Sequence, residues 1–161
     1  MLIHSAVKLK NEGKSIDEVA TWLEENKLHA CHFFTVSDLN HLYRGGRVSK
    51  TAAFLGTLIH IKPILYVDNE GTLIPSTKVK GRKKSIQTLV DKMKENIGDY
   101  KNDTIFISHG DCMKDIEYLK ELITKEFGKK EFIVNYVSPT IGAHSGPDTI
   151  ALFFYGKTRI I

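Results

Sequence analysis

Residues 37–49 read Ser37-Asp38-Leu39-Asn40-His41-Leu42-Tyr43-Arg44-Gly45-Gly46-Arg47-Val48-Ser49. A second glycine-rich stretch lies about a hundred residues further on and reads Ile141-Gly142-Ala143-His144-Ser145-Gly146-Pro147. Glycine lets the backbone approach a ligand closely because it has no Cβ. The planar fork of arginine matches the oxygens of a carboxylate or a phosphate. We therefore expect two turns that meet and form one anion-binding corner, with apolar helices and strands walling a pocket beside it.

Three side chains are the main candidates for this corner: Arg47, His144 and Ser145. Arg47 follows the glycine pair and precedes Ser49, a potential helix cap, so it should lie beside a helix N-terminus, where anions are favoured. Arg44 is the competitor, but it closes a short helix and could equally bond the last carbonyls of that helix. His144 can donate to an oxyanion without a long flexible stem; alternatively, it is a turn histidine held by backbone bonds.

Periodicity of apolar residues predicts mixed secondary structure. The helices are expected at 2–10, 16–26, 38–44, 50–60, 83–96 and 114–127, and the strands at 29–36, 64–67, 72–79, 104–108, 132–137 and 149–154. Ser15 and Glu18 form a capping box, and Ser37 and Ser49 are expected to cap the third and fourth helices. A hairpin turn is expected at 68–71, with Pro75 at a sheet edge or a bulge. This pattern predicts an α/β (α+β-like) fold, a two-layer sandwich of a mixed β-sheet with helices mainly on one face.

Composition limits the function. The 161 residues suit one domain with a real core, and the net charge of +4 favours anionic ligands. The basic run 78–84 is interpreted as a solvated loop and first helical turn, and an RNA-binding module would need interleaved aromatic residues, so no nucleic-acid partner is predicted. Two cysteines indicate a reducing, cytoplasmic setting. The N-terminal residues lack an apolar signal segment, and no apolar run approaches the ~20 residues of a membrane span.

Histidines and cysteines raise two further hypotheses. His29 and His32 are close in sequence, but they have opposite parity on the expected strand and would face opposite sides of the sheet, so we predict no metal site. His109 and Cys112 could form a thiol nucleophile with its base. No third group that would orient them is evident, and we favour a plain loop after a strand.

Four blocks in this order carry a resemblance to a known family: residues 37–49, Ile61-Lys62-Pro63-Ile64-Leu65, Lys80-Gly81-Arg82-Lys83-Lys84 and residues 141–147. Together they resemble the DegV family of fatty-acid-binding proteins. The resemblance implies two domains, of which the first grips the lipid carboxylate and the second covers the lipid. It also implies a non-catalytic carrier whose bound long-chain fatty acid is phosphorylated by the ATP-binding subunit of a separate fatty acid kinase, with no cofactor of its own.

Carried onto this chain, the resemblance assigns residues 1–28 to helices left over from, or linking to, a missing N-terminal domain. Residues 29–161 would be the second, lipid-covering domain of a DegV-like protein. Arg47, His144 and Ser145 would contact the head group or its phosphate, with Arg44 and Lys62 as further candidates. The expected lining of the acyl chain is Phe54, Leu58, Ile59, Ile61 and Ile64, although the same residues at the same spacing would also suit a plain core.

The chain departs from the family in two ways. It matches the C-terminal half, so the carboxylate-gripping domain would have to come from elsewhere. The family usually continues the histidine segment as Gly-Pro-Gly, whereas Asp148 follows Gly146-Pro147 here. That carboxylate could cap a following segment, or repel an anion if it faced inward. An alternative function is an enzyme acting on a phosphorylated or acyl substrate, with Arg47 as the phosphate clamp and His144 as the general acid.

Overall fold

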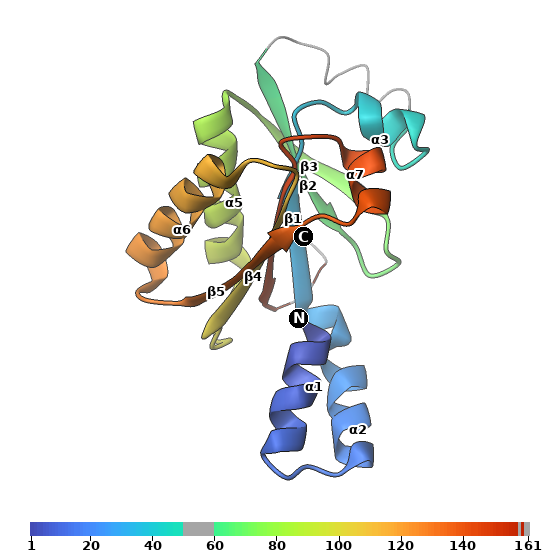
Figure 1. The fold of residues 1–161 in the computed structure, drawn as a ribbon, viewed down its shortest axis with the longest axis vertical. Helices are drawn as coiled ribbons and strands as arrows, with labels where there is room; N and C mark the ends of the chain where they lie inside the picture. The colour runs from blue at the N-terminus through green and yellow to red at the C-terminus, as the bar shows by residue number, and fades with distance from the viewer. Residues whose placement is uncertain (50–59, 158, 160–161) are drawn as a thin grey trace.

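A six-stranded mixed sheet forms the centre of the molecule (Figure 1). The computed structural model describes residues 1–49, 60–157 and 159. The strands are β1 (Ala30–Thr35), β2 (Ile61–Val67), β3 (Leu73–Lys80), β4 (Thr104–His109), β5 (Glu131–Tyr136) and β6 (Ile150–Tyr155). Their order across the sheet is β3-β2-β1-β6-β4-β5. β4 and β5 are parallel, and the other neighbours are antiparallel.

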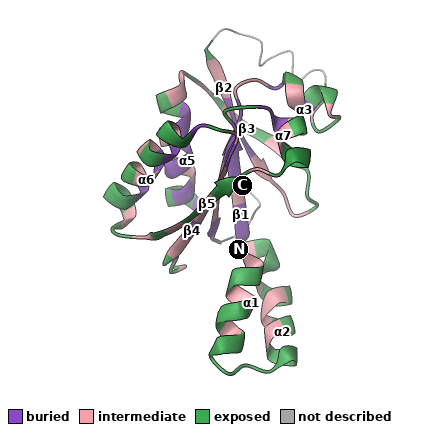
Figure 2. Cartoon of the chain, in the orientation of Figure 1, coloured by how far each residue is buried: buried purple, intermediate pink, exposed green. Residues whose placement is uncertain are grey.

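Two long helices cover one face of the sheet (Figure 2). α5 (Arg82–Asn96) and α6 (Met113–Phe127) bury their apolar stripes against the inward side chains of the strands. Cys31 and Phe33 of β1 point into this core, and so do Leu152 and Phe154 of β6. Alternation along each strand sends the intervening residues to the opposite face. The predicted two-layer sandwich with its long helices on one face is therefore confirmed.

Two short helices lie over part of the opposite face. α3 (Asn40–Arg44) and α7 (Pro139–Ser145) pack beside each other near the end of the sheet where β1 finishes (Figure 1). Beneath α3, a second apolar cluster joins Leu39 and Leu42 to Phe34 of β1 and Leu65 of β2. Among the described residues, the middle of this face lines a pocket, and His4, near the N-terminus, packs on Phe106 further along it.

A helical hairpin extends from the far end of the sheet (Figure 1). It consists of α1 (Leu2–Asn11) and α2 (Ile16–Asn26), followed by the 3-10 turn η1 (Lys27–His29). The predicted capping box of α2 is present, with Ser15 and Glu18 each bonding the other's backbone N–H. The Ser5 and Tyr155 hydroxyls lie 2.8 Å apart and join the hairpin to β6.

The local structure at Ser37 and at residues 141–147 differs from what the sequence predicts, whereas the structure at Pro75 agrees with it. Ser37 does not cap a helix: α3 begins at Asn40, with Leu39 at the cap position, and the Ser37 hydroxyl donates elsewhere. The expected turn at 141–147 is largely helical, because Ser138 caps α7 and Pro139 occupies its first position. The predicted bulge is real, since the β2–β3 register shifts opposite Pro75 on the edge strand β3. The helix expected at 50–60 lies almost wholly outside the described residues.

Candidate ligand-binding site

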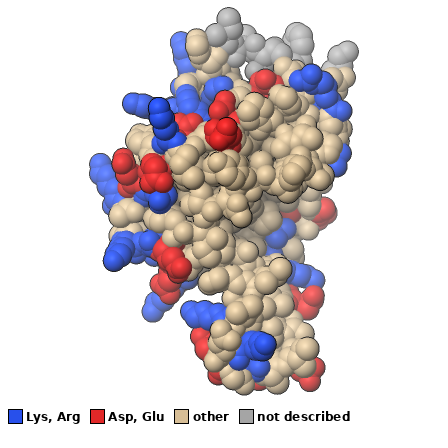
Figure 3. Space-filling model, viewed as in Figure 1, with Lys and Arg blue, Asp and Glu red and all other residues tan. Residues whose placement is uncertain are grey.

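A pocket of about 450 Å³ lies between the open face of the sheet and the short helices α3 and α7. Phe34, Ala151 and Phe153 of the sheet contribute to its lining, together with Val67 of β2 and Leu73 of β3. Figure 3 shows a broad uncharged area across the middle of the surface in view, with charged side chains gathered towards its edges. Such a pocket suits a ligand that is mostly apolar.

All three main candidates for the anion-binding corner line this one pocket: Arg47, His144 and Ser145. The Arg47 guanidinium is exposed and donates to the Gly45 carbonyl at 2.5 Å. Ser145 is buried, and its hydroxyl donates to the Ile141 carbonyl of its own helix at 2.9 Å. The exposed arginine therefore retains donors for a ligand, whereas the serine hydroxyl is already engaged as a donor and keeps only acceptor capacity.

Two glycines allow the segments of α3 and α7 to pack closely, because each leaves room for a histidine of the other segment. A Cβ on Gly45 would lie 2.1 Å from Nδ1 of His144, and a Cβ on Gly146 would lie 2.5 Å from Cδ2 of His41. Each histidine thus occupies the space that a side chain on the other segment's glycine would fill. Gly45 has φ −78°, so its requirement for glycine comes from this contact and not from its backbone angles.

The secondary candidates lie elsewhere. Arg44 donates through Nε to the Asn40 carbonyl at 3.4 Å, the helix-closing role that competed with ligand binding in the sequence. It lines a smaller outer hollow of about 340 Å³ together with His41 and His144. Lys62 donates through Nζ to the Ser37 carbonyl at 2.9 Å and is not among the lining residues of the main pocket.

The expected acyl-lining residues fall into two groups. Ile64 is fully buried in the core on the α5 side of the sheet, and neither it nor the half-buried Ile61 lines the pocket. The other three, Phe54, Leu58 and Ile59, lie outside the described residues. Among the described residues, every strand of the sheet contributes to the lining instead, together with residues of α7.

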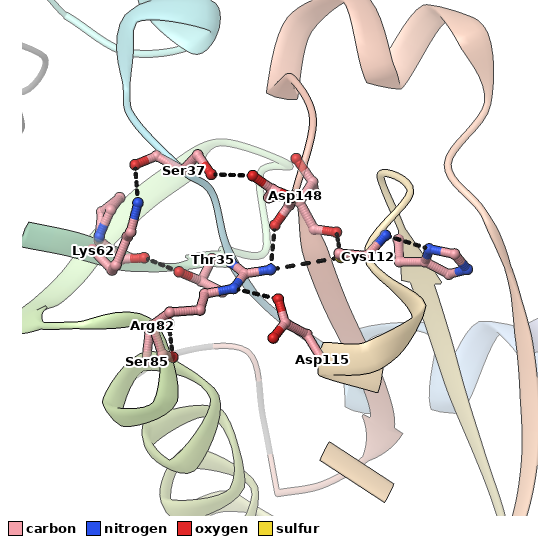
Figure 4. A network of polar contacts seen from close by, with 11 residues as sticks. Thr35, Ser37, Lys62, Arg82, Ser85, Cys112, Asp115 and Asp148 are labelled. Carbon is pink, nitrogen blue, oxygen red and sulfur yellow. Dashed lines mark hydrogen bonds and ion pairs between the residues drawn. The ribbon is translucent and has the colours of Figure 1, made fainter. Parts of the chain in front are cut away.

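A polar network joins three of the four sequence blocks to Asp148, which directly follows the fourth (Figure 4). The Arg82 guanidinium donates to Asp115 Oδ2 at 2.8 Å and to the Asp148 carbonyl at 2.7 Å. Ser37 in turn donates to Asp148 Oδ2 at 3.0 Å, and Lys62 donates to the Ser37 carbonyl. The loops that lead into α3 and out of α7 are therefore fastened to the start of α5 and of α6.

Asp148 lies where the resemblance led us to expect glycine, and its backbone angle suits that expectation. Its φ is +59°, in the left-handed region that glycine enters without strain and aspartate tolerates better than most residues. Its carboxylate faces Ser37 and is not among the lining groups of the pocket. The repulsion of an anion that the sequence raised as an alternative is thus not supported by where this side chain lies.

His109 and Cys112 are adjacent, as the thiol hypothesis requires, but their contacts favour the structural interpretation. Nδ1 of His109 accepts a hydrogen bond from the backbone N–H of Cys112, and the His109 ring packs on Tyr136. Burial raises the pKa of the Cys112 thiol to about 11. The thiol is therefore protonated at neutral pH, whereas a nucleophilic cysteine needs a lowered pKa.

His32 lies on the floor of the pocket and carries a perturbed pKa. Burial, followed by the positive charge of Arg159, lowers the pKa of the imidazole to about 4. His32 is therefore neutral at the pH of a cell. His32 therefore adds no charge to the floor of the pocket at that pH.

This shift predicts a pH dependence of stability. Because the folded-state pKa lies below the usual value of 6.5, the unfolded chain takes up a proton at His32 first, and the free energy of unfolding falls as the pH drops from about 6.5 to about 4. We expect this group to contribute a loss of about 2–3 kcal/mol over that window. Urea titrations of the wild type and His32→Leu at several pH values would measure it. Parallel pH profiles of the two proteins would contradict the expectation.

The sequence did not single out Asp115 or the role of Arg82. The signal was present in the third block, which places an arginine directly after Gly81, a residue with φ +91° at the start of α5. No group of three or more histidine, cysteine, aspartate or glutamate residues that could hold a metal occurs in the described part of the chain. Within those same residues, no helix is both long and apolar enough to cross a bilayer.

Comparison with known proteins gives the class. Residues 1–157 match the family described as "Uncharacterised protein, DegV family". The chain is 46% identical over 159 residues to the DegV domain-containing protein CPE0026 of Clostridium perfringens, covering 99% of this chain and 55% of that protein. The chain therefore belongs to the DegV family. It spans about half the length of the curated relatives that it matches.

The solved structures that share the fold include two from streptococci. The fatty acid binding DegV family protein SAG1342 of Streptococcus agalactiae aligns with a TM-score of 0.82 and 30% identity, over 98% of this chain and 55% of that one. The Fatty Acid Kinase (Fak) B3 protein of Streptococcus pneumoniae, solved with linoleic acid, aligns with a TM-score of 0.87 over 97% of this chain and 55% of that one. At 20% identity, the second likeness shows the fold alone.

Proposed function

We propose that this chain binds a long-chain fatty acid in the pocket on the open face of the sheet. One observation carries the proposal: Arg47 and the neighbouring pair His144 and Ser145, about a hundred residues apart in the sequence, line one pocket whose other walls are mainly apolar. A carboxylate or acyl phosphate matches the arginine fork and the imidazole, and an acyl chain matches the sheet. The relative from S. agalactiae, at 30% identity, is described as fatty acid binding and supports the assignment.

The free energies expected for the two ends of the ligand differ, so the acyl tail and the head group have different roles in binding. Burial of an acyl tail is worth about 0.8 kcal/mol per CH₂, so a full chain contributes roughly ten or more kcal/mol before ordering costs are subtracted. A corner of two or three polar contacts supplies less. The tail thus provides the affinity, and Arg47 with His144 fixes the orientation of the head group.

The proposed partners follow from this division. The chain is a non-catalytic, cytoplasmic carrier whose ligand is the fatty acid itself, with no further cofactor, and the ATP-binding subunit of a fatty acid kinase phosphorylates the exposed carboxylate. Residues 29–161 act as the lipid-covering domain. Residues 1–28 join it to a first domain that grips the carboxylate, and the exposed apolar side chains Ile3, Val7 and Ile16 support such packing.

Substitutions at the corner test these roles. We expect Arg47→Ala and His144→Ala to change the Kd for a long-chain fatty acid less than about threefold. Formation of acyl phosphate by the kinase subunit should fall roughly a hundredfold, because these side chains stabilise charge that develops during transfer. Binding would be measured by fluorescence titration and transfer with radiolabelled ATP. Arg44→Ala is the matched control, since Arg44 bonds its own helix, and equal losses of binding and transfer would refute the division of roles.

A further inference from the structure

The floor of the pocket runs down the open sheet face from the head-group corner to His32. Thr149 lies near the corner, where its hydroxyl donates to the Gly146 carbonyl, and it lines the pocket. Phe153 is four residues further along β6 and pairs with His32 of β1. At a rise of about 3.3 Å per residue, His32 lies about 13 Å below Thr149. An acyl chain that leaves the corner along the sheet therefore reaches His32 near its middle.

The hollow continues beyond His32. His32, Ser108 and Phe153 line both the main pocket and a second hollow of about 520 Å³, which extends past Phe106 and Ile133 towards α1. A long acyl chain thus has room on both sides of the imidazole. His32 is consequently a side chain that the ligand must pass, and not the end of the pocket.

The imidazole of His32 lacks hydrogen-bond partners among the described residues. Its ring contacts the edge or face of Phe153 at 5.1 Å between centroids, and its other neighbours on this face include Phe34 and Ala151. No hydrogen bond joins either ring nitrogen to the described part of the chain. Since the ring is neutral, one of its two nitrogens is an N–H donor and the other is an acceptor. A plain alkyl chain laid over it would leave both groups without partners, which is unfavourable.

We propose that the pocket prefers a fatty acid with a hydroxyl group near the middle of its chain, and that His32 binds that hydroxyl. The inference rests on the proposed function and narrows its ligand class. A hydroxyl both donates and accepts, so it can pair with either ring nitrogen.

A competition experiment tests the preference. The delipidated protein is mixed with equal amounts of stearic acid, 10-hydroxystearic acid and 2-hydroxystearic acid, and the bound acids are extracted and counted by mass spectrometry. We expect 10-hydroxystearic acid to be enriched about 3- to 10-fold over the other two, the size of one hydrogen bond to a buried group. His32→Leu should remove the enrichment, and His32→Gln, which keeps a donor and an acceptor, should retain part of it.

The outcomes separate the two proposals. Binding of stearic acid at equal or greater occupancy by the wild type would overturn the role of His32 and leave fatty-acid binding intact. Equal enrichment of the 2-hydroxy and 10-hydroxy acids would also overturn it, because the contact would then not depend on position along the chain. If none of the three acids binds, the proposed function itself fails. Should His32→Leu not fold, the wild-type ratio of the two hydroxy acids still decides the matter.

Discussion

Replacing Gly45 with alanine is expected to slow acyl-phosphate formation strongly while leaving the fold intact. The added Cβ would lie 2.1 Å from Nδ1 of His144, so the imidazole must leave its place. The backbone of Gly45, at φ −78° and ψ −1°, accepts alanine without strain. We therefore expect stability within about 1 kcal/mol of the wild type. Acyl-phosphate formation should fall roughly 10- to 100-fold, since a displacement of about 1 Å at a reacting group costs that much.

Gly46 provides a matched control, because the neighbouring glycine is required for the opposite reason. A Cβ there meets nothing within 4 Å, but its φ of +71° strains any side chain. Gly46→Ala should therefore lower the free energy of unfolding by about 1 kcal/mol and leave the orientation of His144 unchanged. Chemical denaturation together with transfer assays on both variants would separate the effects. A Gly45→Ala protein with normal transfer activity would show that the position of His144 does not matter.

The two glycines also show which features could be predicted from the sequence and which could not. Both were visible as a helix-stopping pair, and periodicity placed the sheet and the long helices within a few residues of their observed bounds. The same pair could not reveal that Gly45 is a contact point for His144, because that depends on a segment about a hundred residues away. Helix α7 was missed for a related reason: its seven residues are too few for periodicity, and its signal was the cap Ser138 followed by Pro139.

The position of the pocket could likewise not be predicted from the periodicity of apolar residues. Alternation along β1 distinguishes two faces, but the sequence does not say which face carries the long helices and which stays open. The candidate Ile64 illustrates this point, since its parity on β2 turns it towards α5 while its neighbour Leu65 faces the α3 side. Arg47 and His144 were chosen as candidates because their chemistry and the resemblance both pointed to them, and the structure shows only that both line the pocket. His32 was considered only as a metal ligand, because its missing partner is apparent only in three dimensions.

Arg82→Ala is expected to be the most destabilising of the substitutions considered. The guanidinium bonds Asp115, the carbonyl of Asp148 and, at 3.5 Å, the sulfur of Cys112. The salt bridge is largely withdrawn from solvent, with exposed fractions of 21% for the Arg82 side chain and 32% for that of Asp115. Removing the cation leaves a carboxylate and a carbonyl short of donors. We expect the free energy of unfolding to fall by about 2–3 kcal/mol, measured by urea denaturation.

Three further variants test whether the loss of stability in Arg82→Ala comes from the polar network around Arg82. Lys83→Ala removes an exposed cation next along the same helix and should change stability by less than about 0.5 kcal/mol. Arg82→Lys should recover only part of the loss, because one ammonium cannot reach Asp115 and the Asp148 carbonyl with the geometry of a fork. Combining Arg82→Ala with Asp115→Ala should cost less than the sum of the two. Strict additivity would mean that Arg82 and Asp115 do not stabilise the fold through their ion pair.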